Sequence, residues 1–182
     1  MQASEVLSFW FGQDRKRWFE KNPALDEEIR SRFLPLFEQG LSGGLEGWKS
    51  DPRACLALVL LFDQFPRNMF RGTARAFAGD ELARACATTI VEKAWDKAMT
   101  PDERLFAYLP LEHSESLADQ ERCLALMREI AVYPETADMP KWAEAHLAII
   151  RRFGRFPHRN TALGRESTAE EIEFLSQPGS SF

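Results

Sequence analysis

The chain has 182 residues, 45% of them hydrophobic, and it carries a formal net charge of −5. This length suggests one domain with a real core, and the acidic balance argues against nucleic acid, whose binding faces are usually strongly basic. The longest apolar run, residues 54–62, is much shorter than the roughly 20 residues that span a bilayer. We therefore expect a single domain over residues 1–182 that binds neither nucleic acid nor a membrane.

Cysteine usage and the first residues bear on the compartment. Cys55, Cys86 and Cys123 lie far apart without a CxxC pair, each within an apolar helical pattern, so we interpret them as reduced core residues. Residues 1–5 lack the basic region and apolar run of a signal peptide. These features predict a cytoplasmic protein. Because no P-loop or Rossmann glycine pattern occurs, we expect no cofactor.

Hydrophobic residues recur at helical spacing along most of the chain, and β-branched residues are scarce. Asparagine, aspartate, serine or threonine stands before several of these stretches, often followed by proline, as at helix starts. We therefore predict an all-α fold with about eight helices and a loose tail over residues 177–182. The expected helices lie near residues 4–11, 23–39, 52–65, 80–95, 101–109, 116–130, 140–156 and 168–176.

Prolines bracket the central helices. The stretch from Pro52 to Pro66 is apolar on nearly every side, which is typical of a fully buried helix. Because the residue before a proline is disfavoured in helical geometry, we expect Pro66, Pro110 and Pro157 to end their helices.

One sequence motif recurs along the chain. Phe62 to Asn68 reads FDQFPRN, residues 153–160 read FGRFPHRN, and residues 106–115 contain a weaker copy. The three prolines are 44 and 47 residues apart, within the unit length of helical repeats. This spacing predicts a superhelical array of degenerate, tetratricopeptide-like helical hairpins.

If these units stack in parallel, the polar residues near each proline lie on one side of the molecule. Arginine, asparagine and histidine can bind a carboxylate or phosphate through directional hydrogen bonds. The candidate binding residues are Arg67, Asn68 and Arg71 in the first cluster, Glu112, His113, Ser114 and Glu115 in the second, and Arg155, His158, Arg159 and Asn160 in the third.

Asp63 is the sharpest single observation, because this carboxylate lies in the most apolar stretch of the chain. A buried carboxylate needs an arginine or several donors, since leaving it unpaired costs several kcal/mol. We expect Arg67, Arg71, Arg155 or Arg159 to supply the charge, in a structural ion pair rather than a catalytic one. Gln64 is also a candidate, with its amide expected to bond a loop backbone.

Metal binding and catalysis are weaker hypotheses. His113, His158, Glu112 and Glu115 are acceptable ligand types, but no HExxH or similar spacing joins them, so we expect no metal site. His113 or His158 could act as a general acid or base, because histidine titrates near neutral pH. His146 lies on an apolar stripe and is interpreted as a core histidine.

Residues 151–165 hold five arginines in an otherwise acidic protein. They could form an anion-binding rim, or they could be solvated charges balanced by Glu166, Glu170 and Glu171. The sequence leaves both interpretations open.

The chain resembles an uncharacterised, mostly bacterial family, domain of unknown function 924. The resemblance implies an all-α fold similar to tetratricopeptide-like proteins, and it implies no known reaction, cofactor or catalytic residue. It covers nearly the whole chain and is carried by Val6 to Gly12, Trp18-Phe19, Phe62 to Asn68, Leu109-Pro110 with His113-Ser114-Glu115, Phe153 to Asn160, Leu163-Gly164-Arg165, Ser167-Thr168 and Glu170-Glu171.

Three functions remain in view. The first is a binding module whose polar groove takes a peptide end or a small anionic ligand. The second is an enzyme for a small polar substrate, with His113 or His158 as acid or base. The third is a purely structural polar network whose partners bind elsewhere.

Overall fold

The computed structural model describes residues 1–180, in which all regular secondary structure is helical and no strand occurs. The expected all-α class is confirmed. No helix in this range combines the length and hydrophobicity needed to cross a bilayer. The α-helices are α1 (Ala3–Phe11), α2 (Pro23–Leu41), α3 (Pro52–Val59), α4 (Phe65–Met69), α5 (Asp80–Glu92), α6 (Pro101–Glu112), α7 (Leu117–Ile130), α8 (Met139–Phe153), α9 (Asn160–Leu163) and α10 (Ala169–Leu175).

Short helical turns join these elements. A π-helical turn, Leu60–Gln64, connects α3 directly to α4. The 3₁₀ turns are Arg15–Trp18, Glu46–Ser50, Ala74–Phe77, Trp95–Ala98, Pro134–Thr136 and Pro157–Arg159.

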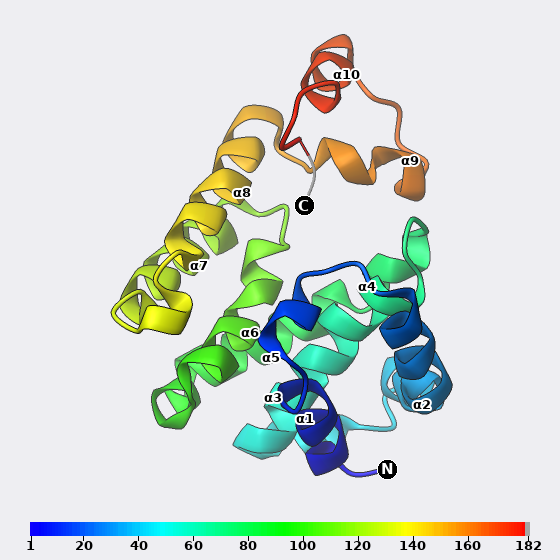
Figure 1. The fold of residues 1–182 in the computed structure, drawn as a ribbon, viewed down its shortest axis with the longest axis vertical. Coiled ribbons are helices and arrows are strands. Elements are labelled where there is room, and N and C mark those ends of the chain that lie inside the picture. The colour runs from blue at the N-terminus through cyan, green and yellow to red at the C-terminus, as the bar shows by residue number, and fades with distance from the viewer. Residues whose placement is uncertain (181–182) are drawn as a thin grey trace.

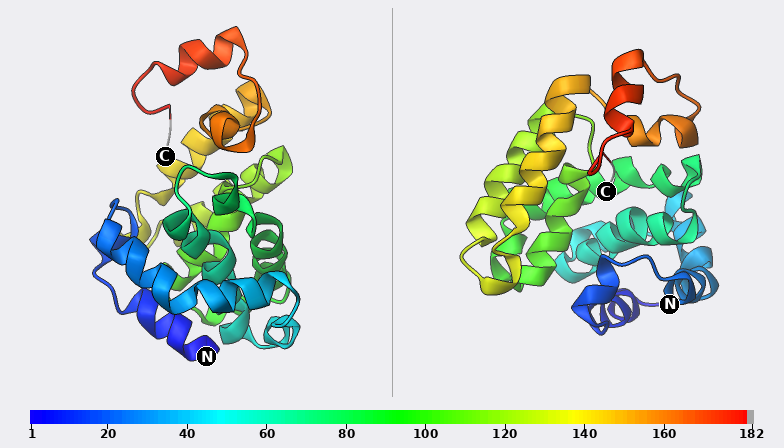
Figure 2. Two further views of the ribbon diagram at one scale, coloured as in Figure 1. Left: turned by 90° about the vertical axis from the view of Figure 1, so that its right-hand side faces the viewer. Right: turned by 45° about the horizontal axis from the view of Figure 1, so that its top comes forward.

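Helix α3 is the central element, since it packs against α1, α5 and α6. Helix α5 packs against α6, α6 against α7, and α7 against α8, and Figure 1 shows α7 and α8 side by side along one flank. Figure 2 shows that α9 and α10 lie at the end of the molecule away from the N-terminus. A tetratricopeptide-like repeat array remains a prediction.

One main hydrophobic cluster fills the body of the molecule. Its aromatic rings pack edge to face or tilted, with the Phe33 and Phe65 centroids 4.8 Å apart and those of Trp10 and Phe106 5.4 Å apart. The three cysteines are buried and free. A second, smaller cluster of Ile149, Ile150 and Phe156 lies under the C-terminal segment. That segment therefore depends less on apolar packing and more on polar contacts.

Pro66 does not end its helix, which corrects the sequence-based expectation. The backbone stays helical through the π turn, where the Phe65 N–H donates to the Leu60 carbonyl, and the helix continues to Met69. Pro66 lies in the first turn of α4, a position where the missing N–H is tolerated. The π turn widens the helix just before the proline ring, so the chain need not leave helical geometry.

The other two prolines also differ from expectation. Pro110 lies inside α6, which ends at Glu112. Helix α8 already ends at Phe153, where Gly154 adopts a left-handed conformation with φ 69°, as glycine readily does after a helix. Pro157 then begins the following 3₁₀ turn. Prolines in this chain mark helix interiors and starts, while α4, α6 and α8 end at Met69, Glu112 and Phe153, close to the polar clusters.

The last described residues follow α10. Ser180 is buried and its hydroxyl donates to the Leu175 carbonyl at 3.2 Å. Residues 181–182 lie outside the described residues, and the loose tail over 177–182 stays a prediction.

Candidate functional site

The π turn holds Asp63 in the interior with no exposed surface. One carboxylate oxygen lies 2.7 Å from His113 Nδ1 and 3.2 Å from the Arg67 guanidinium. The Gln64 amide donates to the other oxygen at 2.7 Å. The expected burial and arginine pairing of Asp63 are confirmed, whereas the expected Gln64 bond to a loop backbone is wrong. Single π turns within α-helices are frequent at functional sites.

Arg67 also joins the π turn to the start of α5. Its guanidinium donates twice to the Asp80 carboxylate, at 2.7 and 3.1 Å. Gly79 makes this approach possible, because a Cβ at this position would lie only 2.4 Å from the Phe62 carbonyl oxygen. The close packing of the Gly79 backbone against the π turn therefore brings Asp80 to Arg67.

Arg159 is a buried cation, with 7% of its surface exposed. It donates to the His113 carbonyl at 2.9 Å and lies 3.6 Å from Asp80. Its Nε has no hydrogen-bond partner among the residues that the structure describes. Its guanidinium stacks on Phe77 and Phe156, 4.8 and 4.5 Å from their ring centroids. Burial, together with the charge of Arg67, lowers the pKa of Arg159 to about 10.

All three histidines lie in this region. The His113 and His146 ring centroids are 6.3 Å apart, and Phe156 lies 5.7 Å from His146 and 5.6 Å from His158. Burial lowers the pKa of His146 to about 3 and that of His158 to about 4, and it also moves the pKa of His113 downward. The imidazoles are therefore neutral at neutral pH.

Glu112 is a buried carboxyl group beside the histidines. It is 4% exposed, and its Oε1 lies 3.5 Å from His146 Nδ1. Burial and then the nearby Asp63 charge raise the pKa of Glu112 to about 8. Burial acts on Asp63 in the same direction, but Arg67 and His113 hold the pKa of Asp63 well below its ordinary value. Two nearby carboxyl groups thus differ in protonation, a pattern typical of acid–base sites.

We call these residues the central cluster. Its members come from the π turn and from α4, α5, α6, α8 and the turn Pro157–Arg159. They are Asp63, Gln64, Arg67, Asp80, Glu112, His113, His146, His158 and Arg159.

Three other candidates belong to a second set of contacts, the C-terminal network, which is made of Glu115, Arg155, Asn160, Arg165 and Glu171. Arg155 donates to both Glu171 oxygens at 2.7 and 2.8 Å, and Arg165 donates to both Glu115 oxygens at 2.8 and 3.0 Å. Asn160 bonds Ser167, Glu171 and Arg165. This network ties α9 and α10 to the end of α6.

The remaining candidates lie apart from the centre. Asn68 and Arg71 both bond Asp26 of α2, at 2.7 to 2.8 Å. The Ser114 hydroxyl donates to Asp119 at 2.7 Å, near the start of α7. The predicted convergence therefore holds for Asp63, Gln64, Arg67, Glu112, His113, His158 and Arg159 only.

The basic segment is largely balanced, as one of the two interpretations expected. Arg151 pairs with Glu121, Arg152 with Glu170 and Arg155 with Glu171. Arg159 differs from these three because it is buried and incompletely bonded.

Sequence reasoning missed two members of the central cluster. Asp80 is the first residue of the helix predicted over residues 80–95, and His146 is predicted to be a core residue. His146 is buried, as expected, but it also lies beside Glu112. For both, the sequence shows a polar residue next to an apolar stripe. That pattern does not indicate which residue of another helix the side chain will contact.

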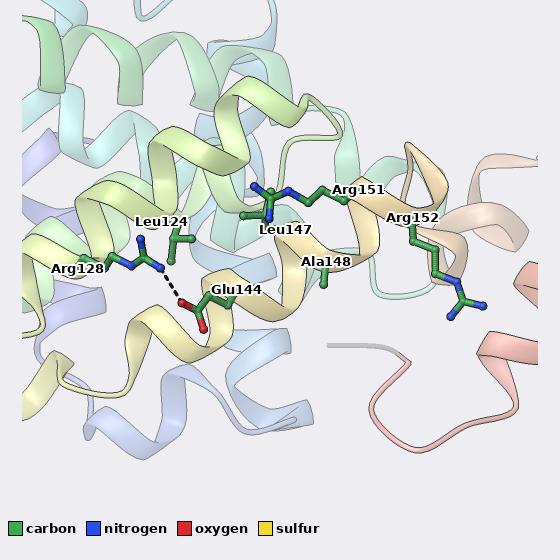
Figure 3. A pocket seen from close by; sticks show the side chains of 7 residues that line it. All are labelled: Leu124, Arg128, Glu144, Leu147, Ala148, Arg151 and Arg152. Atoms are coloured by element: carbon green, nitrogen blue, oxygen red, sulfur yellow. Dashed lines mark hydrogen bonds and ion pairs between the residues drawn. The ribbon is translucent and has the colours of Figure 1, made fainter.

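Two surface grooves of about 490 Å³ lie outside the central cluster. Figure 3 shows the groove between α7 and α8, with Arg128 bonded to Glu144 at 2.9 Å. The other lies beside Asn68 and Arg71. Within residues 1–180 no group of three or more His, Cys, Asp and Glu side chains is arranged to hold a metal ion. The expectation of no metal and no cofactor stays a prediction.

Comparison with known proteins gives a family but no activity. The model of a family described as bacterial protein of unknown function (DUF924) matches residues 6–179. A solved structure of a protein of unknown function, ATU0120 from Agrobacterium tumefaciens, is 40% identical, with a TM-score of 0.87. The match covers 95% of this chain and 96% of that one. No curated protein matches this chain.

Proposed function

Because the chain belongs to the family of bacterial proteins of unknown function named DUF924, whose description gives no activity, we propose from the site alone that the central cluster binds a small anionic molecule. The observation that carries the proposal is Arg159, a buried guanidinium with an unbonded Nε. Buried charges in proteins are normally paired and fully hydrogen-bonded. An anion is the group that would complete the pairing.

The charge balance around Arg159 favours this function. Asp80 is shared, because it bonds Arg67 twice and lies 3.6 Å from Arg159. The Arg159 pKa of about 10 means that its nearby carboxylates do not fully compensate the burial of its charge. Guanidinium groups bind carboxylate and phosphate with paired, directional hydrogen bonds. A bound anion would raise the Arg159 pKa and lower the free energy of the folded state.

Limited access indicates a small ligand rather than a peptide end. The side chains of Arg67, His113 and Asp80 are 19%, 17% and 27% exposed. Phe77 lies against both guanidiniums, 5.5 Å from Arg67 and 4.8 Å from Arg159. The cluster thus reaches the surface over a small area beside one aromatic ring.

The compartment is part of the same proposal. Three buried free cysteines are typical of proteins in reducing compartments. We propose a cytoplasmic protein whose ligand is a small metabolite anion.

Thermal unfolding tests the proposal with two named probes, sodium phosphate and sodium acetate, each compared with sodium chloride at equal ionic strength. Specific binding stabilises the folded state by about 2.7 kcal/mol at a ligand concentration of 100 times Kd. We expect a saturable rise in Tm for at least one probe. Direct titration calorimetry of the wild type gives the same answer without any substitution.

Matched variants locate the site. Arg159→Gln and Arg67→Gln should lose the rise in Tm. Arg151→Gln removes an exposed arginine that pairs on the surface and should keep it. Equal responses in Arg159→Gln and the wild type, or a linear response to every salt, would rule out the proposed site.

A further inference from the structure

We infer that the central cluster is also a proton-transfer site, with His113 as the base, Asp63 as the residue that orients it, and Glu112 as the acid. Its substrate would be a small organic anion that carries a hydroxyl group or an activated C–H bond. This inference rests on the proposed anion binding, because the arginines hold the molecule on which His113 acts.

The first step concerns the proton on His113. Its Nδ1 lies 2.7 Å from an Asp63 oxygen, and an ionised carboxylate only accepts hydrogen bonds. Nδ1 therefore carries the proton and donates a hydrogen bond to Asp63. The other ring nitrogen, Nε2, keeps its lone pair, as in catalytic histidines that a buried aspartate orients.

The second step concerns access to that nitrogen. No hydrogen bond reaches His113 Nε2 from any of residues 1–180, and the side chain is 17% exposed. Arg159 donates to the His113 carbonyl at 2.9 Å. The free nitrogen and the buried guanidinium therefore belong to neighbouring groups, as a base and its substrate anchor should.

The third step concerns rigidity. Asp63 accepts hydrogen bonds from Gln64 and His113 and a close contact from Arg67, so its position is fixed from three sides. It lies in a π turn braced by Gly79. A base that is held in place needs less reorganisation when the proton moves.

The fourth step concerns protonation around His113. Burial, Arg67 and Arg159 favour its neutral form, while Asp63 favours the cation, and the pKa moves downward on balance. His146 and His158 are neutral neighbours. Glu112 keeps its proton to a pKa of about 8. A free base and a protonated acid therefore coexist at neutral pH, which general acid–base catalysis requires.

The proton balance is simple. His113 Nε2 takes a proton from the O–H or C–H bond of the substrate, and the bonding electron pair stays on the substrate. Glu112 gives its proton to a basic oxygen of the same molecule. The site resets when His113, whose side chain is 17% exposed, releases one proton to solvent and Glu112 takes one up. The net reaction is an isomerisation by proton transfer.

The main test is nitrogen-15 NMR of the wild-type histidines between pH 5 and 9. We expect His113 to be neutral at pH 7 with its proton on Nδ1 and an unprotonated Nε2. We also expect its titration midpoint below the ordinary pKa of about 6.5. A proton on Nε2, or a midpoint above 6.5, would overturn the inference.

Chemical reactivity gives an independent readout with diethyl pyrocarbonate, which modifies unprotonated imidazole nitrogen. We expect Nε2 of His113 to react at pH 6, and Asp63→Asn to slow this reaction by at least about tenfold because the tautomer is no longer fixed. An unreactive His113 in the wild type would contradict a catalytic base.

Two wild-type readouts separate this inference from the proposed binding: the rise in Tm with phosphate or acetate reports the binding, and the tautomer of His113 reports the inference. A wild type without any such rise defeats the proposed function, whereas a wrong tautomer of His113 defeats the inference alone.

Discussion

The central cluster and the C-terminal network contain the same kinds of side chains, yet the cluster holds buried groups whose charge is disfavoured. In the network, the hydrogen bonds from Arg155 lower the pKa of Glu171 to about 2. The pKa of Glu115 is also lowered, although burial acts to raise it. In the cluster, burial raises the pKa of Glu112 to about 8 and lowers that of Arg159 to about 10. The network stabilises the charged carboxylates, whereas the cluster stabilises the charges of Asp63 and Arg67 and disfavours those of Glu112 and Arg159.

Hydrogen bonding explains the difference. Arg155 and Arg165 each donate twice to one carboxylate. Arg159 donates one hydrogen bond to the His113 carbonyl, and the Asp80 carboxylate lies 3.6 Å away. Leaving a buried cation incompletely bonded costs stability, so a purely structural role does not explain Arg159. Perturbed ionisable groups gather at functional sites, so this comparison supports the proposal that the cluster, rather than the network, binds a ligand.

The largest effect should come from Asp63→Ala. This change leaves Arg67 and His113 without their buried anionic acceptor, and we expect a loss of about 3 kcal/mol in the free energy of unfolding. Urea denaturation measures it, with Glu170→Ala as the control because its pair with Arg152 is exposed. A loss below about 1 kcal/mol would place Asp63 in the same class as a surface ion pair.

Gly79→Ala should have the next largest effect. The added methyl group would meet the Phe62 backbone at 2.4 Å, so α5 must move away from the π turn, at a cost of about 2 kcal/mol. Asp80 would move with it, and the response of Tm to phosphate should change. Gly47→Ala is the control, because no atom lies within 4 Å of its added Cβ. Equal stability of the two variants would refute the close packing.

Glu112 should give the protein an alkaline loss of stability. Its folded pKa of about 8 lies above the ordinary glutamate value of 4.5, so stabilisation that is complete below pH 4.5 is lost as the pH rises through 8. The folded pKa values of the histidines lie below 6.5, so their contribution grows only up to about that pH.

Between pH 7 and 8.5 we therefore expect a decrease of about 1 kcal/mol in the wild-type free energy of unfolding. Glu112→Gln should remove this decrease, since glutamine does not ionise. Urea denaturation at the two pH values measures both proteins. The same decrease in both would show that another group titrates.

The smallest effect on stability should come from the network. Arg165→Ala removes a partly exposed bidentate pair with Glu115, and we expect a loss of about 1 kcal/mol. The phosphate response of Tm should not change. A lost response would mean that the network and the cluster form one site.

These contrasts also show what the sequence could predict. A single carboxylate in an apolar stretch predicted that Asp63 is buried and paired, because burial dictates pairing whatever the fold. The recurring sequence motif predicted that Arg67, His113 and Arg159 lie close together. Both predictions depend on residue chemistry that acts within or between similar segments.

Other features depend on contacts that no local pattern records. The π turn lets the helix pass Pro66, so the proline was misinterpreted as an end. Asp80 reaches Arg67 because Gly79 lets two backbones approach. His146 belongs to the central cluster because its ring lies beside Glu112, which is on another helix. Tertiary neighbours decided each of these outcomes.

The most direct test of the central claim is the free energy of unfolding of Arg159→Met in sodium chloride, with and without phosphate. Methionine keeps the apolar contacts with Phe77 and Phe156 but removes the incompletely bonded charge. If the cluster holds Arg159 for a ligand, the variant should be at least as stable as the wild type, and phosphate should no longer stabilise it. A loss of more than about 2 kcal/mol together with an unchanged phosphate response would show that Arg159 is a structural residue.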